Sequence, residues 1–243
     1  MEKFVPLARI AIAISMAAFA IQQLIYGAFV TRLIPNPPPW IPTHPALAYI
    51  SGLIILLAAV AIAFNRWSRT SALLLASIGI LSGLLIDLPK LLSNVHNGSL
   101  WTYTGKAFAL AAAALLVGRT FIPLARYFLA AFFVIAGIEH FIYAQFVATL
   151  VPSWIPGHYF WTYFAGVALI AGGIGILVRR TARLAATLSA VMVFLWVWML
   201  HVPRALAAPH DSNETTAVFE AIAFSAAACL LSTASKRGSG RSR

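Results

Sequence analysis

The chain has a single cysteine, Cys229, among its 243 residues. One thiol excludes an intramolecular disulfide and a paired-thiol relay. The chain is therefore neither a disulfide-stapled secreted domain nor, by itself, a disulfide-generating partner of a quinone. It also lacks glycine-rich phosphate loops and nucleophile motifs, which excludes a nucleotide-binding enzyme. Because Cys229 falls inside an apolar stretch, we expect it to act as a small packing residue.

Charged residues are also scarce in this sequence. Only 9% of the residues are charged and six are acidic, whereas 61% are hydrophobic. The mean hydropathy is +0.89. These values lie far outside the range of a soluble domain, so they exclude a soluble nuclease and indicate a protein of the lipid bilayer.

The first half of the chain returns in the second half. Residues 4–9 return as 121–126, and residues 21–35 return as 138–152. Self-similarity of this kind is typical of a tandem repeat. After an insertion in the first half at residues 36–39, one register continues without a gap through the pairs His44/His158, Tyr49/Tyr163, Gly52/Gly166, Arg66/Arg180 and Pro89/Pro203.

The repeat divides the chain into three segments. We expect residues 1–117 and 118–234 to form one four-helix membrane repeat each, and residues 235–243 to form a basic, disordered cytoplasmic tail. An even number of spans gives both repeats the same orientation, related by a pseudo-two-fold axis along the membrane normal. The predicted fold class is an all-α polytopic membrane protein, with eight transmembrane helices arranged as two parallel four-helix repeats.

Each half contains four apolar stretches long enough, as helices, to cross about 30 Å of hydrocarbon at about 1.5 Å per residue. The first stretch has some features of a signal peptide, but its counterpart lies in mid-chain, so we expect it to remain as a span. The predicted spans are residues 10–30, 46–64, 71–88, 100–118, 127–150, 159–178, 184–202 and 216–232.

Basic residues gather on one side of this eight-span arrangement. The positive-inside rule makes that side cytoplasmic and predicts a bacterial-type cytoplasmic (inner) membrane protein with both termini in the cytoplasm. Because the net charge of +11 is dispersed over short loops, we expect no nucleic-acid partner. The cytoplasmic side would carry Lys3, Arg9, Arg66, Arg69, Arg119, Arg126, Arg179, Arg180, Arg183 and the basic tail, whereas Arg32, Lys90, Lys106 and Arg204 fall toward the other side. Trp40, Trp154, Tyr159 and Trp161 are expected in an aromatic belt at the outer interface.

Polar side chains recur at matching depths near the outer face of both halves. Because such groups are costly in lipid, each is a functional hypothesis by default. The first half has Asp87 opposite Lys106 and the second has His201 opposite Glu220, so we expect an ion pair within each half. The candidate site residues are Glu139, His140, His158, His201, Arg204 and Glu220 in the second half, and Gln22, Gln23, His44, Asp87, Lys90 and Lys106 in the first.

Three interpretations of this polar layer remain open. Imidazole and carboxylate groups bind transition metals such as zinc, copper or iron. The same groups hydrogen-bond to a quinone head group and exchange protons with it. In the third interpretation the layer is polar packing that holds helices together.

Four segments of the second half resemble the DoxX-like membrane proteins: residues 137–141, 146–156, 161–166 and 183–186. The resemblance covers most of residues 121–205 and extends more faintly to the first half through the repeat. It implies a four-helix membrane module, which this chain would carry twice. Some members of that family are subunits of thiosulfate:quinone oxidoreductase or are associated with redox complexes of the cell envelope.

The leading hypothesis is a DoxX-like integral membrane subunit of a redox-linked system, with a quinone or a metal bound in the outer polar layer. The sequence has no flavin, haem-attachment or iron–sulfur motif, so a redox role would require a partner protein, and we do not expect a stand-alone enzyme. The rival hypothesis is a non-catalytic permease or assembly scaffold whose polar layer is structural. In both hypotheses the lipid bilayer surrounds the protein.

Overall fold

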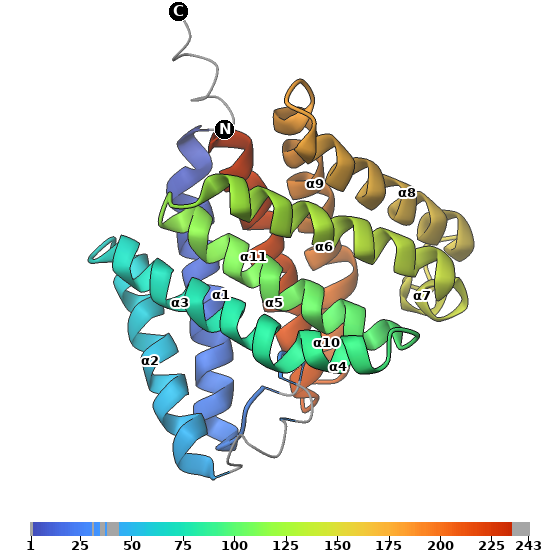
Figure 1. Cartoon of the computed structure of the whole chain (residues 1–243). Coiled ribbons are helices and arrows are strands. Elements are labelled where there is room, and N and C mark those ends of the chain that lie inside the picture. The colour runs from blue at the N-terminus through green and yellow to red at the C-terminus, as the bar shows by residue number, and fades with distance from the viewer. Residues whose placement is uncertain (1, 31, 35–36, 38–43, 235–243) are drawn as a thin grey trace, which may run out of the picture.

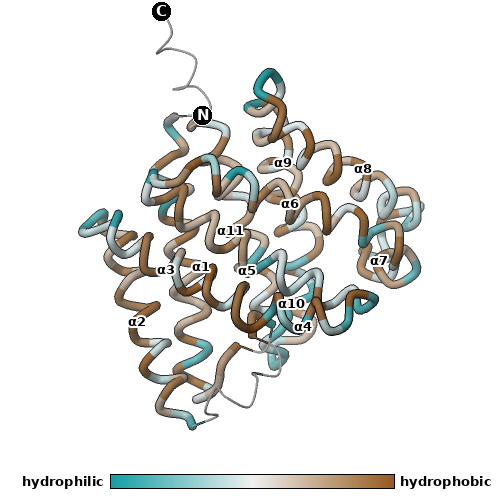
Figure 2. The backbone as a smooth tube through the Cα atoms, viewed as in Figure 1, coloured by the Kyte–Doolittle hydropathy of each residue, from teal (hydrophilic) through white to brown (hydrophobic). Residues whose placement is uncertain are grey.

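The computed structural model describes residues 2–30, 32–34, 37 and 44–234. Within these residues every regular element is a helix. Eight helical segments are long and apolar enough to span a membrane, and Figure 2 shows hydrophilic residues mainly at the turns between them. The predicted all-α polytopic fold is therefore confirmed. The predictions for Trp40, for most of the insertion at 36–39 and for the tail at 235–243 lie outside the described residues.

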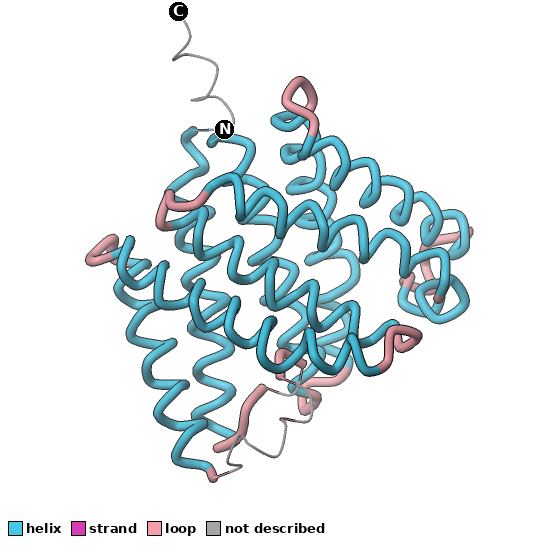
Figure 3. Tube along the Cα trace, viewed as in Figure 1, coloured by secondary structure: helices cyan, strands magenta, loops and turns pink. Residues whose placement is uncertain are grey.

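Short loops join most of the helices, as Figure 3 shows, whereas residues 27–44 connect α1 to α2. A 3₁₀ turn, η1 (Glu2–Phe4), precedes the first span. The first half contains α1 (Val5–Tyr26), α2 (Pro45–Ala63), α3 (Ser68–Ser82), the π-helix η2 (Gly83–Asp87), α4 (Leu88–Ser93) and α5 (Gly98–Val117). The second half contains α6 (Ile122–Ile142), α7 (Ala144–Leu150), α8 (His158–Leu177), α9 (Ala182–Trp196), the π-helix η3 (Val197–His201), α10 (Val202–Ala207) and α11 (Ser212–Ala234).

The spans form a closed ring of neighbours (Figure 1). In chain order α1 packs on α2, α2 on α3, α3 on α5, α5 on α6, α6 on α8, α8 on α9 and α9 on α11, and α11 returns to pack on α1. The helices α5 and α11 also contact each other across the middle, and they are the most buried of the eight spans.

The two halves interlock rather than lie side by side. Helix α1 opens the first half and packs extensively on α11, the last span of the second half. In the same way α6 opens the second half and packs on α5, the last span of the first half. Contacts between α1 and α5 of the first half are few. The molecule is therefore one body, with equivalent helices related across the contact between α5 and α11.

Small residues let the central helices approach. Ala112 and Ala113 of α5, and Ala227 and Ala228 of α11, are fully buried. In lipid the tails are as apolar as the side chains, so close packing of small residues is a main source of helix association. The alanine-rich sequences of α5 and α11 therefore suit the centre of the ring.

A proline explains each π-helical segment. Pro89 and Pro203 lie two residues after η2 and η3. Proline has no N–H to donate, and its ring collides with the carbonyl four residues earlier, which here belongs to Leu85 or Met199. The helix widens at this point instead of ending, and such π-bulges are frequent at functional sites.

The third and seventh spans are consequently longer than predicted. They continue past proline as α4 and α10 to Ser93 and Ala207, so the predicted ends at residues 88 and 202 were wrong. The boundaries of two other spans also differ. Helix α1 starts at Val5 and stops before Gly27, which adopts a left-handed φ of 59°. The predicted span 127–150 is divided into α6 and the short α7.

Candidate functional site

Three charged side chains meet beside the central contact of α5 and α11. Lys106 Nζ lies 3.0 Å from Glu220 Oε2, and Arg32 Nε donates a hydrogen bond to the same oxygen at 2.8 Å. The side chains of Glu220 and Lys106 are 4% and 9% exposed, whereas Arg32, from the α1–α2 connection, is 32% exposed. We term these three residues the central charge cluster.

One oxygen of this cluster has no hydrogen bond among the described residues. Arg32 and Lys106 both pair with Glu220 Oε2, whereas Glu220 Oε1 is buried and has no hydrogen-bond partner there. A buried acceptor that makes no hydrogen bond loses the stabilisation that water would give it. Glu220 therefore presents an acceptor that a hydrogen-bond donor would satisfy.

The ion pair forms between the halves and not within them. Lys106 and Glu220 are equivalent positions of the two repeats, and they meet because α5 and α11 face each other. The predicted pairs of Asp87 with Lys106 and of His201 with Glu220 are wrong: neither is an ion pair in the described part of the chain. Asp87 is buried on η2, and its Oδ2 has no hydrogen-bond partner there.

Two equivalent threonines join the halves beside the cluster. Thr102 of α5 donates to Glu139 Oε1 of α6 at 2.6 Å. Its counterpart Thr216 of α11 donates to Gln22 Oε1 of α1 at 2.7 Å. Glu139 and Gln22 are themselves equivalent, so the same hydrogen bond appears twice around the central axis. Glu139 also lies within electrostatic range of Lys106, so the hydrogen bond between Thr102 and Glu139 lies next to the central charge cluster.

His201 and a second ion pair extend the polar region. The His201 side chain, partly buried at the end of η3, lies within electrostatic range of Arg32 and Glu220. Arg204 of α10 makes a two-pronged ion pair with Glu214 in the first turn of α11. Together with Glu139, this polar region contains three cations and three carboxylates, so full ionisation of these six groups would leave it neutral. The cations are Arg32, Lys106 and Arg204, and the carboxylates are Glu139, Glu214 and Glu220.

The interaction with Glu220 stabilises the charged form of the Arg32 side chain. Burial lowers the pKa of Arg32, but the attraction and hydrogen bond of Glu220 outweigh it, so the pKa is raised above its ordinary value. Lys106 Nζ also lies 5.8 Å from the centroid of the Tyr103 ring, within reach of a cation–π interaction. The cluster thus combines charge, hydrogen-bond donors and one aromatic face.

Other predicted site residues have local roles. Gln23 is buried and donates to the Ala48 carbonyl of α2 at 2.9 Å. His44 is exposed, and its Nδ1 accepts from Ala46 N at the start of α2. His158 begins α8 and makes no side-chain hydrogen bond or ion pair in the described part of the chain. Lys90, on α4, interacts electrostatically with Asp87.

His140 faces a different partner from its neighbour Glu139. Its Nδ1 donates to the Ala136 carbonyl at 2.7 Å, and its ring stacks on Trp196 with centroids 6.1 Å apart. The two residues follow each other on α6 and so point about 100° apart, as helical geometry requires. Glu139 therefore hydrogen-bonds to Thr102 in the central polar region. His140 instead stacks on Trp196, the last residue of α9, which directly precedes η3.

Four side chains of this region were not among the site residues predicted from the sequence: Arg32, Thr102, Glu214 and Thr216. Thr102 and Thr216 could have been found, because they are equivalent in the repeat and lie one turn before Lys106 and Glu220. Glu214 lies six residues before Glu220 on the same helix, less than two turns away. Nothing in the sequence shows that Arg32 folds back onto the last span, because the contact depends on the closed ring.

The described residues contain no group of three or more histidine, cysteine, aspartate or glutamate side chains arranged to hold a metal ion. Glu139, His140, His158 and His201 are thus not gathered into one coordination sphere. The cluster combines two cations with one carboxylate, and cations beside a carboxylate disfavour a further positive ion. Its donor set suits a polar organic group better than a metal.

Fold and site together define a polytopic α-helical membrane protein with a charged, hydrogen-bonded centre shared by two repeated halves. Residues 129–236 match the model of a family described as Domain of unknown function (DUF8561), so the second half is similar to that domain. The match contains Glu139, His140, His201 and Glu220. No curated protein and no solved structure matches the chain.

Proposed function

We propose that the protein is a membrane subunit that binds the head group of a quinone, in its oxidised or reduced form, at the central charge cluster. In this proposal it is a DoxX-like protein of the cytoplasmic membrane with both termini in the cytoplasm, and it serves a redox partner protein. The observation that supports the proposal is Glu220. It is a buried carboxylate fixed on one oxygen by Arg32 and Lys106, with its other oxygen free of hydrogen bonds among the described residues.

The chemistry of a quinone head group matches this donor and acceptor set. A quinone has two carbonyl acceptors, for which Arg32 and Lys106 supply N–H donors. A quinol has two hydroxyl donors, for which Glu220 Oε1 is a suitable acceptor. The aromatic ring of Tyr103 lies beside Lys106 and offers a face for a flat ring. The apolar surroundings within the spans suit the isoprenoid tail.

Native mass spectrometry with a short-chain ubiquinone and its quinol tests this proposal. We expect the wild-type protein in mild detergent to retain one ligand per chain. In this proposal His201, which lies within electrostatic range of Arg32 and Glu220, adds one hydrogen bond to the head group. The His201→Ala variant should therefore retain at least about tenfold less ligand, the effect of losing one interaction worth roughly 1.4 kcal/mol. His158→Ala is the matched control, because His158 makes no polar side-chain contact in the described region, and it should bind like the wild type. Equal retention by wild type and His201→Ala would overturn the proposal.

A second candidate function is a non-catalytic permease or scaffold. The observation that favours it is the pairing of Lys106 with its own repeat equivalent, Glu220, which neutralises both side chains without a ligand. The Lys106→Glu/Glu220→Lys double variant distinguishes the candidates. A structural pair should tolerate the exchange with no loss of cellular function. A ligand site should lose ligand retention while the protein stays folded, because donors and acceptor have changed places.

A further inference from the structure

Two turns at the end of the molecule that carries both termini share one geometry. They are the α2–α3 turn at residues 64–67 and the α5–α6 turn at residues 118–121. In each turn an amide donates to the carbonyl five residues earlier, Arg66 N to Ala61 O and Thr120 N to Leu115 O. Both helices therefore end in the same type of hydrogen-bonded cap.

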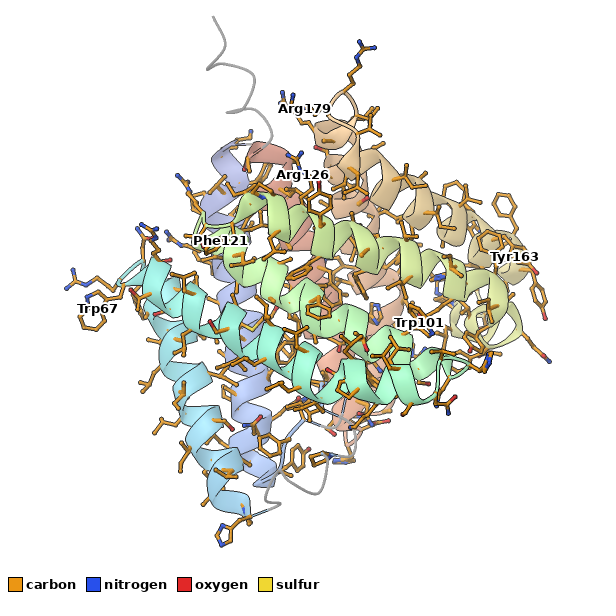
Figure 4. All side chains as sticks on the ribbon, in the orientation of Figure 1. Trp67, Trp101, Phe121, Arg126, Tyr163 and Arg179 are labelled. Carbon is orange, nitrogen blue, oxygen red and sulfur yellow. The ribbon has the colours of Figure 1, made fainter. Side chains whose placement is uncertain are left out.

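Each turn presents an aromatic residue with an unfavourable backbone conformation. Trp67 has a φ of 46° and Phe121 a φ of 47°, in the left-handed region that bulky residues rarely adopt. Glycine would occupy these positions without strain. Their side chains are 84% and 66% exposed, and Figure 4 shows Trp67 projecting away from the bundle. Packing within the chain therefore does not account for an aromatic at either position.

Arginines lie close to both aromatics in the sequence. Arg66, Arg69 and Arg119 are exposed, and Phe64 beside them is 76% exposed. The two turns lie next to each other, since a Cβ added at Gly118 would lie only 3.1 Å from the Cβ of Ala72 on α3. We term Phe64, Arg66, Trp67, Arg69, Arg119 and Phe121 the basic aromatic surface.

Negative charge is scarce at this end of the molecule. Of the six acidic residues in the sequence, Glu2 is the one that belongs to this end, while the other five follow the ends of other spans or lie in their outer halves. None of the six residues of the basic aromatic surface is acidic, so its three exposed arginines give it a net positive charge that attracts anionic ligands.

We propose that the basic aromatic surface binds the head groups of anionic phospholipids. Each turn joins two membrane-spanning helices directly, so its side chains are held at the level of the lipid phosphates. Tryptophan favours that interfacial level, and arginine pairs with phosphate through two parallel hydrogen bonds. The combination distinguishes these turns from the α8–α9 turn, where Arg179, Arg180 and Arg183 occur without an aromatic residue.

The test uses the full-length protein in nanodiscs made from equal amounts of phosphatidylglycerol and phosphatidylcholine. After transfer to mild detergent, mass spectrometry measures the ratio of the two lipids that stay bound. We expect phosphatidylglycerol to be enriched, and we expect the enrichment to fall by about fivefold for each arginine removed in Arg66→Gln/Arg69→Gln/Arg119→Gln. The matched control, Arg179→Gln/Arg180→Gln/Arg183→Gln, removes the same charge from the same end and should keep most of the enrichment.

A second variant separates lipid binding from folding. Trp67→Gly/Phe121→Gly removes both aromatics and also relieves the left-handed strain, so the protein should remain at least as stable as the wild type. We expect its enrichment in phosphatidylglycerol to fall. An equal fall in the two arginine variants would show diffuse attraction by all basic residues and would overturn the proposal. Unchanged enrichment in the glycine variant would also overturn it.

Discussion

Lys106 and Glu220 are the same position in the two halves of the chain, and their side chains meet at 3.0 Å. In a dimer of identical units, a residue beside the two-fold axis meets its own copy, so a charged residue there would face a like charge. Duplication within one chain removes that restriction because each copy can change separately. The opposite charges at 106 and 220 make the two halves complementary to each other rather than to themselves.

Glu220→Gln should strongly destabilise the fold. It leaves Lys106 buried without its partner, and breaking a buried pair costs about 3–5 kcal/mol. Unfolding by increasing SDS in mixed micelles measures the change. The double exchange Lys106→Glu/Glu220→Lys should recover only part of the loss, because it restores the attraction between positions 106 and 220 but not the hydrogen bond from Arg32 to Glu220. A double variant no more stable than Lys106→Glu alone would contradict the pairing.

Glu214→Gln should have a much smaller effect. Its partner Arg204 is 35% exposed, so solvent screens the ion pair, and such pairs contribute less than about 1 kcal/mol. The same SDS titration compares this variant with Glu220→Gln. If the two variants were equally unstable, the cluster would not be the buried centre of the charge network.

Thr102→Val and Thr216→Val test whether the repeated hydrogen bonds are equivalent. Each valine preserves the side-chain volume but removes a hydroxyl that joins the halves. We expect a loss of about 1 kcal/mol from either variant. Thr102→Val should be the more damaging because Thr102 donates to the Glu139 carboxyl group, and bonds to charged groups are the stronger ones. Thr187→Val, whose exposed hydroxyl bonds only to its own helix, is the control and should change stability little.

Pro203→Ala should convert η3 toward regular α-helix. The new N–H at residue 203 can donate to the Met199 carbonyl, which proline prevents. Hydrogen–deuterium exchange of the amides from 197 to 202 should slow by about fivefold, as one added hydrogen bond of about 1 kcal/mol predicts. The η2 segment serves as the internal control, because its own Pro89 is unchanged. Faster exchange at η3 would show that proline is not the cause of the π-helix.

Gly173→Ala should destabilise the packing of α6 on α8. An added Cβ would lie 2.7 Å from the Ala130 carbonyl oxygen, which belongs to backbone and cannot rotate away. Overpacking of this kind costs about 1–3 kcal/mol. Gly105→Ala is the comparison, because there the nearest atom belongs to the Phe132 ring, at 3.1 Å, and a side chain can adjust. Thermal unfolding in detergent should rank Gly173→Ala as clearly the less stable variant.

The sequence predicted the fold well because lipid imposes a simple rule on it. A helix must satisfy its own backbone hydrogen bonds in the bilayer, so apolar length alone identifies the spans. The predicted ends of the third and seventh spans, at residues 88 and 202, are wrong, although each directly precedes a proline, Pro89 or Pro203. The following residues remain helical because the π-bulge absorbs the proline.

The sequence pointed to part of the charged region, including Lys106 and Glu220, but not to the pairing of its side chains. The repeat correctly indicated that Lys106 and Glu220 are equivalent, yet the expected partners were Asp87 and His201 on neighbouring helices. Equivalence in sequence does not reveal that equivalent helices face each other. That relation depends on α1 packing on α11 and α6 on α5, which are contacts between residues far apart in the chain. Arg32 was missed for the same reason.

The closed ring also dictates an order of events during biogenesis. Helix α1 is synthesised before the other seven spans, but its main neighbour besides α2 is α11, which is synthesised after them. Until α11 has been made, Gln22 lacks the hydrogen bond that Thr216 donates to it. The ring of eight spans can therefore close only after α11 has entered the membrane and packed on α1.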